Sequence, residues 1–147
     1  MDRRRTNGAR EMMHIHYKEG YKYQLAESYA VLIDIKPAAA IKTKYVRLSV
    51  LGELWIREGY AWDGPSGPAI DTSNFMRGSL IHDALYQLLR EGLLPQDMRE
   101  TADKTLRRIV LEDGMSAIRA WLVYQGVRIG GGPAALPSSD TSVLRAP

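Results

Sequence analysis

The hydrophobic positions of the chain follow two different periods. Between residues 17 and 62, tyrosine and aliphatic residues recur at every second position in places, as in "YAVLIDI" (29–35) and "YVRLSVL" (45–51). A period of two, with many β-branched and aromatic residues, is typical of strands. Because Pro37 and Gly52 interrupt these segments, we predict three or four short antiparallel strands.

From Phe75 onward the apolar residues recur at intervals of three and four, which predicts helices. We expect the first helix to end near Gly92 and the second to run from Pro95 to Gly114. The third is "MSAIRAWLVYQGVRI", which ends at a run of glycines. The predicted fold class is therefore α+β, a small N-terminal antiparallel sheet followed by three helices.

The surroundings of the third helix allow two interpretations. Arg119 and Arg128 flank Trp121, an arrangement that also fits a helix lying on a membrane surface. We favour packing of this helix against the first one, with Trp121 in the core. Trp55 and Trp62 are expected in the core as well.

The length of 147 residues suggests one domain. We place a basic arm at residues 1–16, a single α+β domain at 17–131 and a low-complexity tail at 132–147. A loop with two glycines and two prolines, residues 64–74, lies between the strands and the helices.

The charge and the cysteine count narrow the chemistry. The net charge of +3 equals that of residues 1–10, which hold four arginines and one aspartate, so the excess lies in the arm. Without cysteine, disulfides and thiolate metal sites are excluded, and an oxygen-rich metal site would favour Ca²⁺, Mg²⁺ or Mn²⁺. No apolar segment predicts a transmembrane span or a signal peptide.

Two titratable residues, His82 and Asp83, stand side by side in the otherwise apolar stretch "RGSLIHDALYQLL". Buried polar groups cost free energy unless a partner satisfies them. On a helix, Tyr86 shares the face of His82, whereas Asp83 lies about 100° away. Two antiparallel helices could bring Asp103 to His82, and a carboxylate on one ring nitrogen leaves the other free to accept a proton. We therefore predict that Asp103 orients His82 as a general base.

Asp83 needs a partner of its own, and the preceding loop offers one. The segment "WDGPSG" provides the Asp63 carboxylate and the carbonyls of a glycine-containing turn. Two carboxylates with loop carbonyls form the all-oxygen shell that Ca²⁺ prefers. A cation held there could polarise a carbonyl while His82 activates water. The pattern predicts hydrolysis of an ester.

The order of these motifs resembles the prokaryotic type of secreted phospholipase A2, over roughly residues 62–106. The segment "WDGPS", then "HDALY", then Asp103 resemble that family's calcium loop, HDxxY helix and later aspartate. The resemblance implies three calcium ligands: Asp63, the carbonyl of Gly64, and Asp83. It also implies a catalytic set: His82 as the base, Asp103 as its partner and Tyr86 as a supporting hydroxyl.

A longer stretch, roughly residues 45–131, resembles a family of short tailed-phage proteins of unassigned function (domain of unknown function thirteen-fifty-three). The segments that carry this resemblance are "DGPSGP", "IHDALYQ", "TADKTLRRIV" and "IRAWLVYQGVRIGG". The resemblance implies a phage origin and brings no established activity.

Two functions of different classes remain open. The first is a phage-encoded, virion-associated protein that hydrolyses lipid esters with calcium during entry or lysis. The alternative is a purely structural component of the tail or the head–tail connection, in which the His/Asp network only holds the fold. Expected partners are other virion proteins or host membrane lipid, with no nucleic acid beyond the basic arm. The expected location is the virion or the host cytoplasm.

A simple structural observation would separate these functions. A groove beside His82 that is wide enough for an acyl chain would favour the enzyme. A site sealed by Trp62 would favour the structural role.

Overall fold

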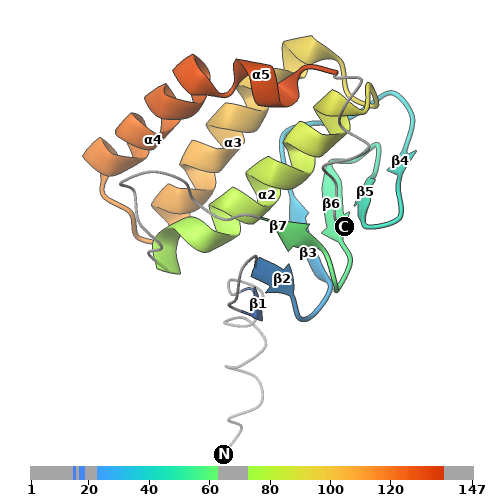
Figure 1. Ribbon diagram of the computed structural model, residues 1–147, viewed down its shortest axis with the longest axis horizontal. Coiled ribbons are helices and arrows are strands. Elements are labelled where there is room, and N and C mark those ends of the chain that lie inside the picture. Colours follow the sequence, from blue (N-terminus) through green and yellow to red (C-terminus); the bar gives the residue numbers. More distant parts are fainter. Residues whose placement is uncertain (1–14, 16, 19–22, 63–72, 138–147) are drawn as a thin grey trace, which may run out of the picture.

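The computed structural model describes residues 15, 17–18, 23–62 and 73–137. The basic arm with its arginines, the loop at 63–72 and the end of the tail lie outside these residues. The predicted calcium ligands Asp63 and Gly64 therefore lie outside them too. Short strands come first along the chain and helices follow (Figure 1). This order confirms the α+β class.

Seven short strands among the described residues form two antiparallel sheets rather than one. The three-stranded sheet has the order β1 (Tyr17–Lys18), β2 (Tyr23–Leu25), β7 (Ala61–Trp62). The four-stranded sheet has the order β3 (Tyr29–Leu32), β6 (Glu53–Ile56), β5 (Val46–Leu48), β4 (Ile41–Lys42).

The predicted alternation is clearest in the pair of β5 and β6. Val46 lies opposite Ile56 and Leu48 opposite Leu54, and all four side chains are fully buried. Side chains of alternate residues point to opposite faces of a strand, so this register gathers one apolar face. Gly52 adopts a φ of 87° in the turn between the two strands, where glycine is favoured.

The three predicted helices are present in the predicted order, and a 3₁₀ turn and a short further helix, which were not predicted, accompany them. They are α2 (Ser73–Arg90), a 3₁₀ turn η1 (Gln96–Met98), α3 (Arg99–Glu112), α4 (Ala117–Gly130) and the short α5 (Gly132–Ala135). Gly92 and Gly114 take positive φ angles just after α2 and α3, as expected of helix C-termini. Helix α5 buries Ala135, so packed structure continues past residue 131.

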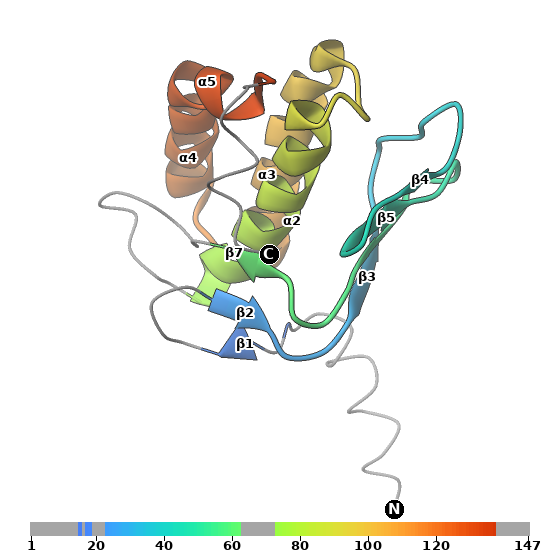
Figure 2. The same ribbon diagram turned by 45° about the vertical axis from the view of Figure 1, so that its right-hand side comes forward.

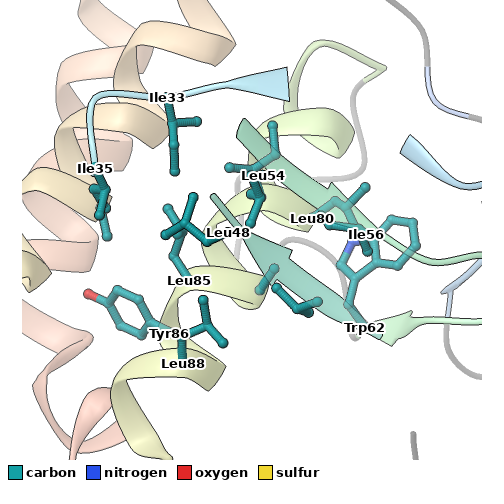
Figure 3. Close-up of a cluster of buried hydrophobic side chains, with 14 of the residues drawn as sticks. Ile33, Ile35, Leu48, Leu54, Ile56, Trp62, Leu80, Leu85, Tyr86 and Leu88 are labelled. Atoms are coloured by element: carbon teal, nitrogen blue, oxygen red, sulfur yellow. The ribbon is translucent and has the colours of Figure 1, made fainter. Parts of the chain in front are cut away.

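Helix α2 lies between the four-stranded sheet and the remaining helices (Figure 2). Thirteen of its eighteen residues are buried. Leu48 and Leu54 of the sheet belong to the same core cluster as Leu80, Leu85 and Leu88 of α2 (Figure 3). Because α2 is enclosed on most sides, its polar residues need protein partners.

Helix α4 departs from the prediction, because it packs chiefly against α3 and exposes most of its large apolar side chains. Among its fourteen residues, all described, only Ala120 is buried. The core placement of Trp121 is wrong, since this side chain is 48% exposed. Trp55 is only partly buried, with the Arg47 guanidinium over its ring. The core placement of Trp62 is confirmed at 3% exposure.

Candidate functional site

A glycine allows α2 and α3 to approach each other closely. A Cβ atom at Gly78 would lie 2.8 Å from Val110 Cγ1 and 2.9 Å from Leu106 Cδ1, which real packing does not tolerate. His82 follows Gly78 by about one helical turn and is therefore carried on the same side, towards α3. The absence of a side chain at Gly78 thus allows the short distance between α2 and α3 across which His82 can reach α3.

Asp103 of α3 is the centre of the site. It is fully buried and receives three side-chain hydrogen bonds. His82 Nε2 lies 2.7 Å from Oδ1, the Tyr86 hydroxyl donates to the same oxygen at 2.6 Å, and Arg128 Nη1 donates to Oδ2 at 2.8 Å. The predicted convergence of His82, Tyr86 and Asp103 is present in the structure.

The charge of Asp103 determines the tautomer of His82. Burial alone raises the pKa of Asp103, but hydrogen bonds from His82, Tyr86 and Arg128 outweigh it and lower the pKa below its usual value. The ionised carboxylate can only accept hydrogen bonds, so His82 Nε2 carries the proton and donates. In the neutral ring, Nδ1 then keeps a lone pair that can accept a proton.

Tyr86 is fixed by more than its bond to Asp103. Its ring lies 4.1 Å from that of His82, measured between centroids, and its hydroxyl accepts a hydrogen bond from Arg99 Nε at 3.2 Å. A Cβ atom at Gly131 would lie 2.7 Å from this hydroxyl, so only glycine fits there without a shift. Burial, then the bond to Asp103, raises the pKa of Tyr86 far above its usual value. Tyr86 is a neutral donor.

Two arginines, neither of them predicted from the sequence as part of the site, extend the network to α4. Arg128 pairs with Asp103, and Arg99 Nη2 donates to the carbonyls of Val127 and Arg128 at 2.9 and 2.8 Å. Arg99 precedes Asp103 by four residues and so shares its helix face, a signal that could have pointed to it. No spacing rule could identify Arg128, because its position depends on how α4 is turned.

A groove of about 750 Å³ borders this network, between α2 and α4. Helix α3 lies behind these two helices in Figure 1. The apolar side chains in its wall are Phe75, Leu106, Leu122, Val123, Val127 and Ala134. The polar side chains in its wall are Ser79, His82, Asp83, Tyr86, Arg90 and Arg119. The volume is in the range of small-molecule sites.

The groove reaches His82 without passing Trp62. The Trp62 indole is buried elsewhere in the core and donates to Ser79 Oγ at 3.1 Å. Among the described residues, Trp62 is not part of the groove wall. In the part of the chain that the structure describes, a groove borders His82 and Trp62 does not seal it.

The predicted calcium site is described only in part. Asp83 is partly buried and lines the groove beside His82. Within the described part of the chain, no three or more His, Cys, Asp or Glu side chains cluster in a way that could hold a metal ion. Since Asp63 and Gly64 lie outside that part, calcium binding stays a prediction.

The fold and site define an α+β protein in which a buried Asp–His–Tyr network borders an apolar groove. Residues 42–127, more than half of the chain, match the family described as "Protein of unknown function (DUF1353)". The chain belongs to this family, as the resemblance of its motifs suggested. Comparisons with curated proteins and with solved structures gave no match.

Proposed function

We propose that this protein is an ester hydrolase in which His82, oriented by Asp103, activates water at the wall of the apolar groove. The observation that carries the proposal is that His82 is both held in place by a carboxylate and accessible from the groove. His82 Nε2 is held by a buried, ionised carboxylate at 2.7 Å, and the same imidazole lines the groove. A general base needs this access to a substrate together with a fixed orientation.

The chemical steps follow from the tautomer. His82 Nδ1 takes a proton from water, whose oxygen attacks the ester carbonyl and forms a tetrahedral intermediate. Asp103 stabilises the imidazolium that results, since the carboxylate stays ionised beside it. The intermediate then expels the alkoxide, and the imidazolium returns the proton to it as the C–O bond breaks. The products are an acid and an alcohol.

The proposed calcium ligands are Asp63, the Gly64 carbonyl and Asp83. Bound Ca²⁺ would supply a Lewis acid that polarises the ester carbonyl. Asp83 supports this assignment, because it lines the groove one residue from His82.

The groove wall favours a lipid ester as the substrate. Six apolar side chains line it and can cover an acyl chain, which removes apolar surface from water. Polar groups lie at the same groove, where His82 would meet the ester. Together with the motif resemblance, this supports a phospholipase A2-like reaction on host membrane lipid during phage entry or lysis.

A structural role in the virion is the second candidate. The observation that favours it is that Asp103 joins α2, α3 and α4 through His82 and Arg128, which a purely structural network would also do. The virion assignment rests on the resemblance to tailed-phage proteins. Mass spectrometry of purified particles that finds the chain, in a protein without hydrolytic activity, would support this candidate.

The His82→Asn variant tests the proposed base. We expect hydrolysis of a phosphatidylglycerol ester to fall by about 10²–10⁴-fold, because asparagine cannot accept the proton. The thermal unfolding temperature of the variant is measured alongside, because asparagine is too short to replace the bond that Nε2 makes to Asp103. The control is Lys104→Gln, an exposed position on α3, which should retain full activity. Equal rates in the His82→Asn variant and the parent would remove the proposal.

The Asp83→Asn variant tests the proposed cation site. Removing one charged oxygen ligand should weaken Ca²⁺ binding by about tenfold or more. Isothermal titration calorimetry of the parent and the variant measures this directly. A parent protein that takes up no Ca²⁺ would contradict the calcium assignment and leave the structural role.

A further inference from the structure

Helix α4 carries a large share of the exposed apolar side chains of the described residues. Ten large hydrophobic side chains are strongly exposed in the described part of the chain, and four of them lie on this helix. They are Ile118 at 75%, Trp121 at 48%, Leu122 at 56% and Ile129 at 83% exposure. A contiguous exposed apolar surface on a folded protein commonly marks a binding surface.

These four side chains share one face of α4, here called the α4 face. At 100° per residue they fall within an arc of about 100°, with Gln125 as the one polar residue inside it. Arg128 follows on one edge of this arc and Arg119 beyond the other. The helix contains no acidic residue. Ala120 lies on the opposite side of α4 and belongs to the cluster packed against α3.

We propose that the α4 face binds the surface of an anionic lipid bilayer. The exposed side of α4 is an apolar arc bordered by cations, while its other side packs against the protein. Such a surface can enter the membrane interface, where arginine reaches the headgroups. Trp121 suits this depth, since indole rings favour the interface. None of the described helices is long and apolar enough to cross a membrane, and α4 would lie along its surface.

The two edge arginines contribute differently. Arg128 already pairs with Asp103, so part of its charge is compensated. Arg119 is exposed at the first turn of α4 and is the cation better placed for a lipid phosphate. The preference for anionic lipid should therefore depend mainly on Arg119.

The α4 face is continuous with the groove. Leu122 and Arg119 both line the groove, and Leu122 belongs to the α4 face. Seating this face on a bilayer would place the groove mouth at the lipid surface. This last step rests on the proposed function, whereas binding to the bilayer rests on the exposure and charge of α4 alone.

A second copy of the chain fits the α4 face less well. Pairing two such faces would bring together two Arg119 side chains, and α4 has no acidic residue to balance them, whereas each Arg128 is already paired with Asp103. Like charges around an interface oppose association. An anionic bilayer instead supplies the opposite charge over its whole surface.

Flotation with lipid vesicles tests the proposal on the full chain. We use ether-linked phosphatidylglycerol mixed with ether-linked phosphatidylcholine, because neither lipid has an acyl ester to hydrolyse. The parent should float with the mixed vesicles and much less with phosphatidylcholine alone. The Ile118→Ser/Ile129→Ser double variant should bind the mixed vesicles about tenfold or more weakly, since it removes apolar surface from the contact.

Two control variants sharpen the test. Leu51→Ser changes a leucine that is 74% exposed in the turn after β5, and it should leave binding unchanged. Arg119→Gln should reduce binding to the mixed vesicles and narrow the difference between the two vesicle types. All variants keep the basic arm, so binding carried by the arm would survive in the double variant.

Three outcomes would overturn the proposal. The parent does not float with anionic vesicles, the double variant floats as well as the parent, or light scattering shows a dimer that the double variant converts to a monomer. The last result would assign the α4 face to self-association. Because the vesicles cannot be hydrolysed at an ester, failure of the proposed hydrolysis leaves this measurement unaffected.

Discussion

Two buried polar networks join α2 to α3, and they differ in what surrounds them. One is centred on Arg77, which is 5% exposed and contacts Tyr29, Glu112 and Asp113. The other is centred on Asp103. Both satisfy a buried charge with several hydrogen bonds, as a protein interior requires. By this measure alone, neither is marked as functional.

The two networks differ in whether they reach the groove and in whether they contain a histidine. The Arg77 network contains no histidine, and among the described residues none of its members lines the groove. In the Asp103 network, His82 lines a groove of about 750 Å³. A polar network that also presents a base to a cavity is what a catalytic site needs. We therefore expect mutation of the Arg77 network to reduce mainly the stability, and mutation of the Asp103 network to reduce mainly the hydrolysis.

The Arg77→Met variant should cause the largest loss of stability. Removing the guanidinium leaves the Asp113 carboxylate, with its side chain 11% exposed, without its main ion-pair partner. Breaking a buried pair from one side costs about 3–5 kcal/mol. Urea denaturation measures the free energy of unfolding, and hydrolysis per folded molecule should stay at the parent level. Lys104→Met, which removes an exposed pair with Glu100, should cost less than about 1 kcal/mol. Similar losses in both variants would contradict the distinction.

The Asp103→Asn variant should cost less stability but should abolish hydrolysis. Hydrogen bonds to a charged group contribute about 1.5–3 kcal/mol, and asparagine retains only some of them. The neutral amide no longer stabilises an imidazolium at His82, so the proposed base is lost. Rates and urea denaturation of the same samples separate the two effects. A variant that unfolds like Arg77→Met yet still hydrolyses esters would reverse the assignment of the two networks.

The pH dependence of stability sharpens this prediction. Since folding lowers the pKa of Asp103, the stabilisation is fully present above the unfolded value of about 3.8 and is lost as the pH falls through the lower folded value. The Asp103→Asn variant lacks this titration. The difference in unfolding free energy between parent and variant should therefore shrink as the pH falls from about 4 into strong acid. A difference that stays constant into strong acid would contradict the lowered pKa.

The sequence predicted the part of the fold that depends on local spacing. The alternation in "YVRLSVL" predicted a strand where β5 lies, and Gly92 and Gly114 marked helix ends. The division into two sheets was not predicted, because pairing between distant short strands leaves no local pattern. Trp121 was misplaced because apolar residues occur nearly all round α4, so periodicity does not tell which side is buried.

The central residues of the candidate site were also predictable from local spacing. His82 and Tyr86 are four residues apart, and a short connection brings the antiparallel α3 with Asp103 beside them. Arg128 depends on the rotation of α4, which Ala120 sets by packing against α3. The close approach at Gly78 also needs knowledge of the opposite helix. The contact between α2 and α3 could be inferred from the sequence, and the contacts made by α4 could not.

Gly126 gives the smallest and most specific test, because it lines the groove without supporting either network. A Cβ atom there meets nothing within 4 Å, so Gly126→Ala should stabilise the helix by about 0.5–1 kcal/mol. Gly126→Leu should fold as well but place its side chain in the groove, which would raise KM for a long-chain ester more than for a short-chain one. Thermal unfolding and the two KM values measure this. A leucine side chain in the groove should obstruct a long acyl chain more than a short one, if the acyl chain lies there. An equal rise in KM for both esters would therefore show that the groove is not the acyl site.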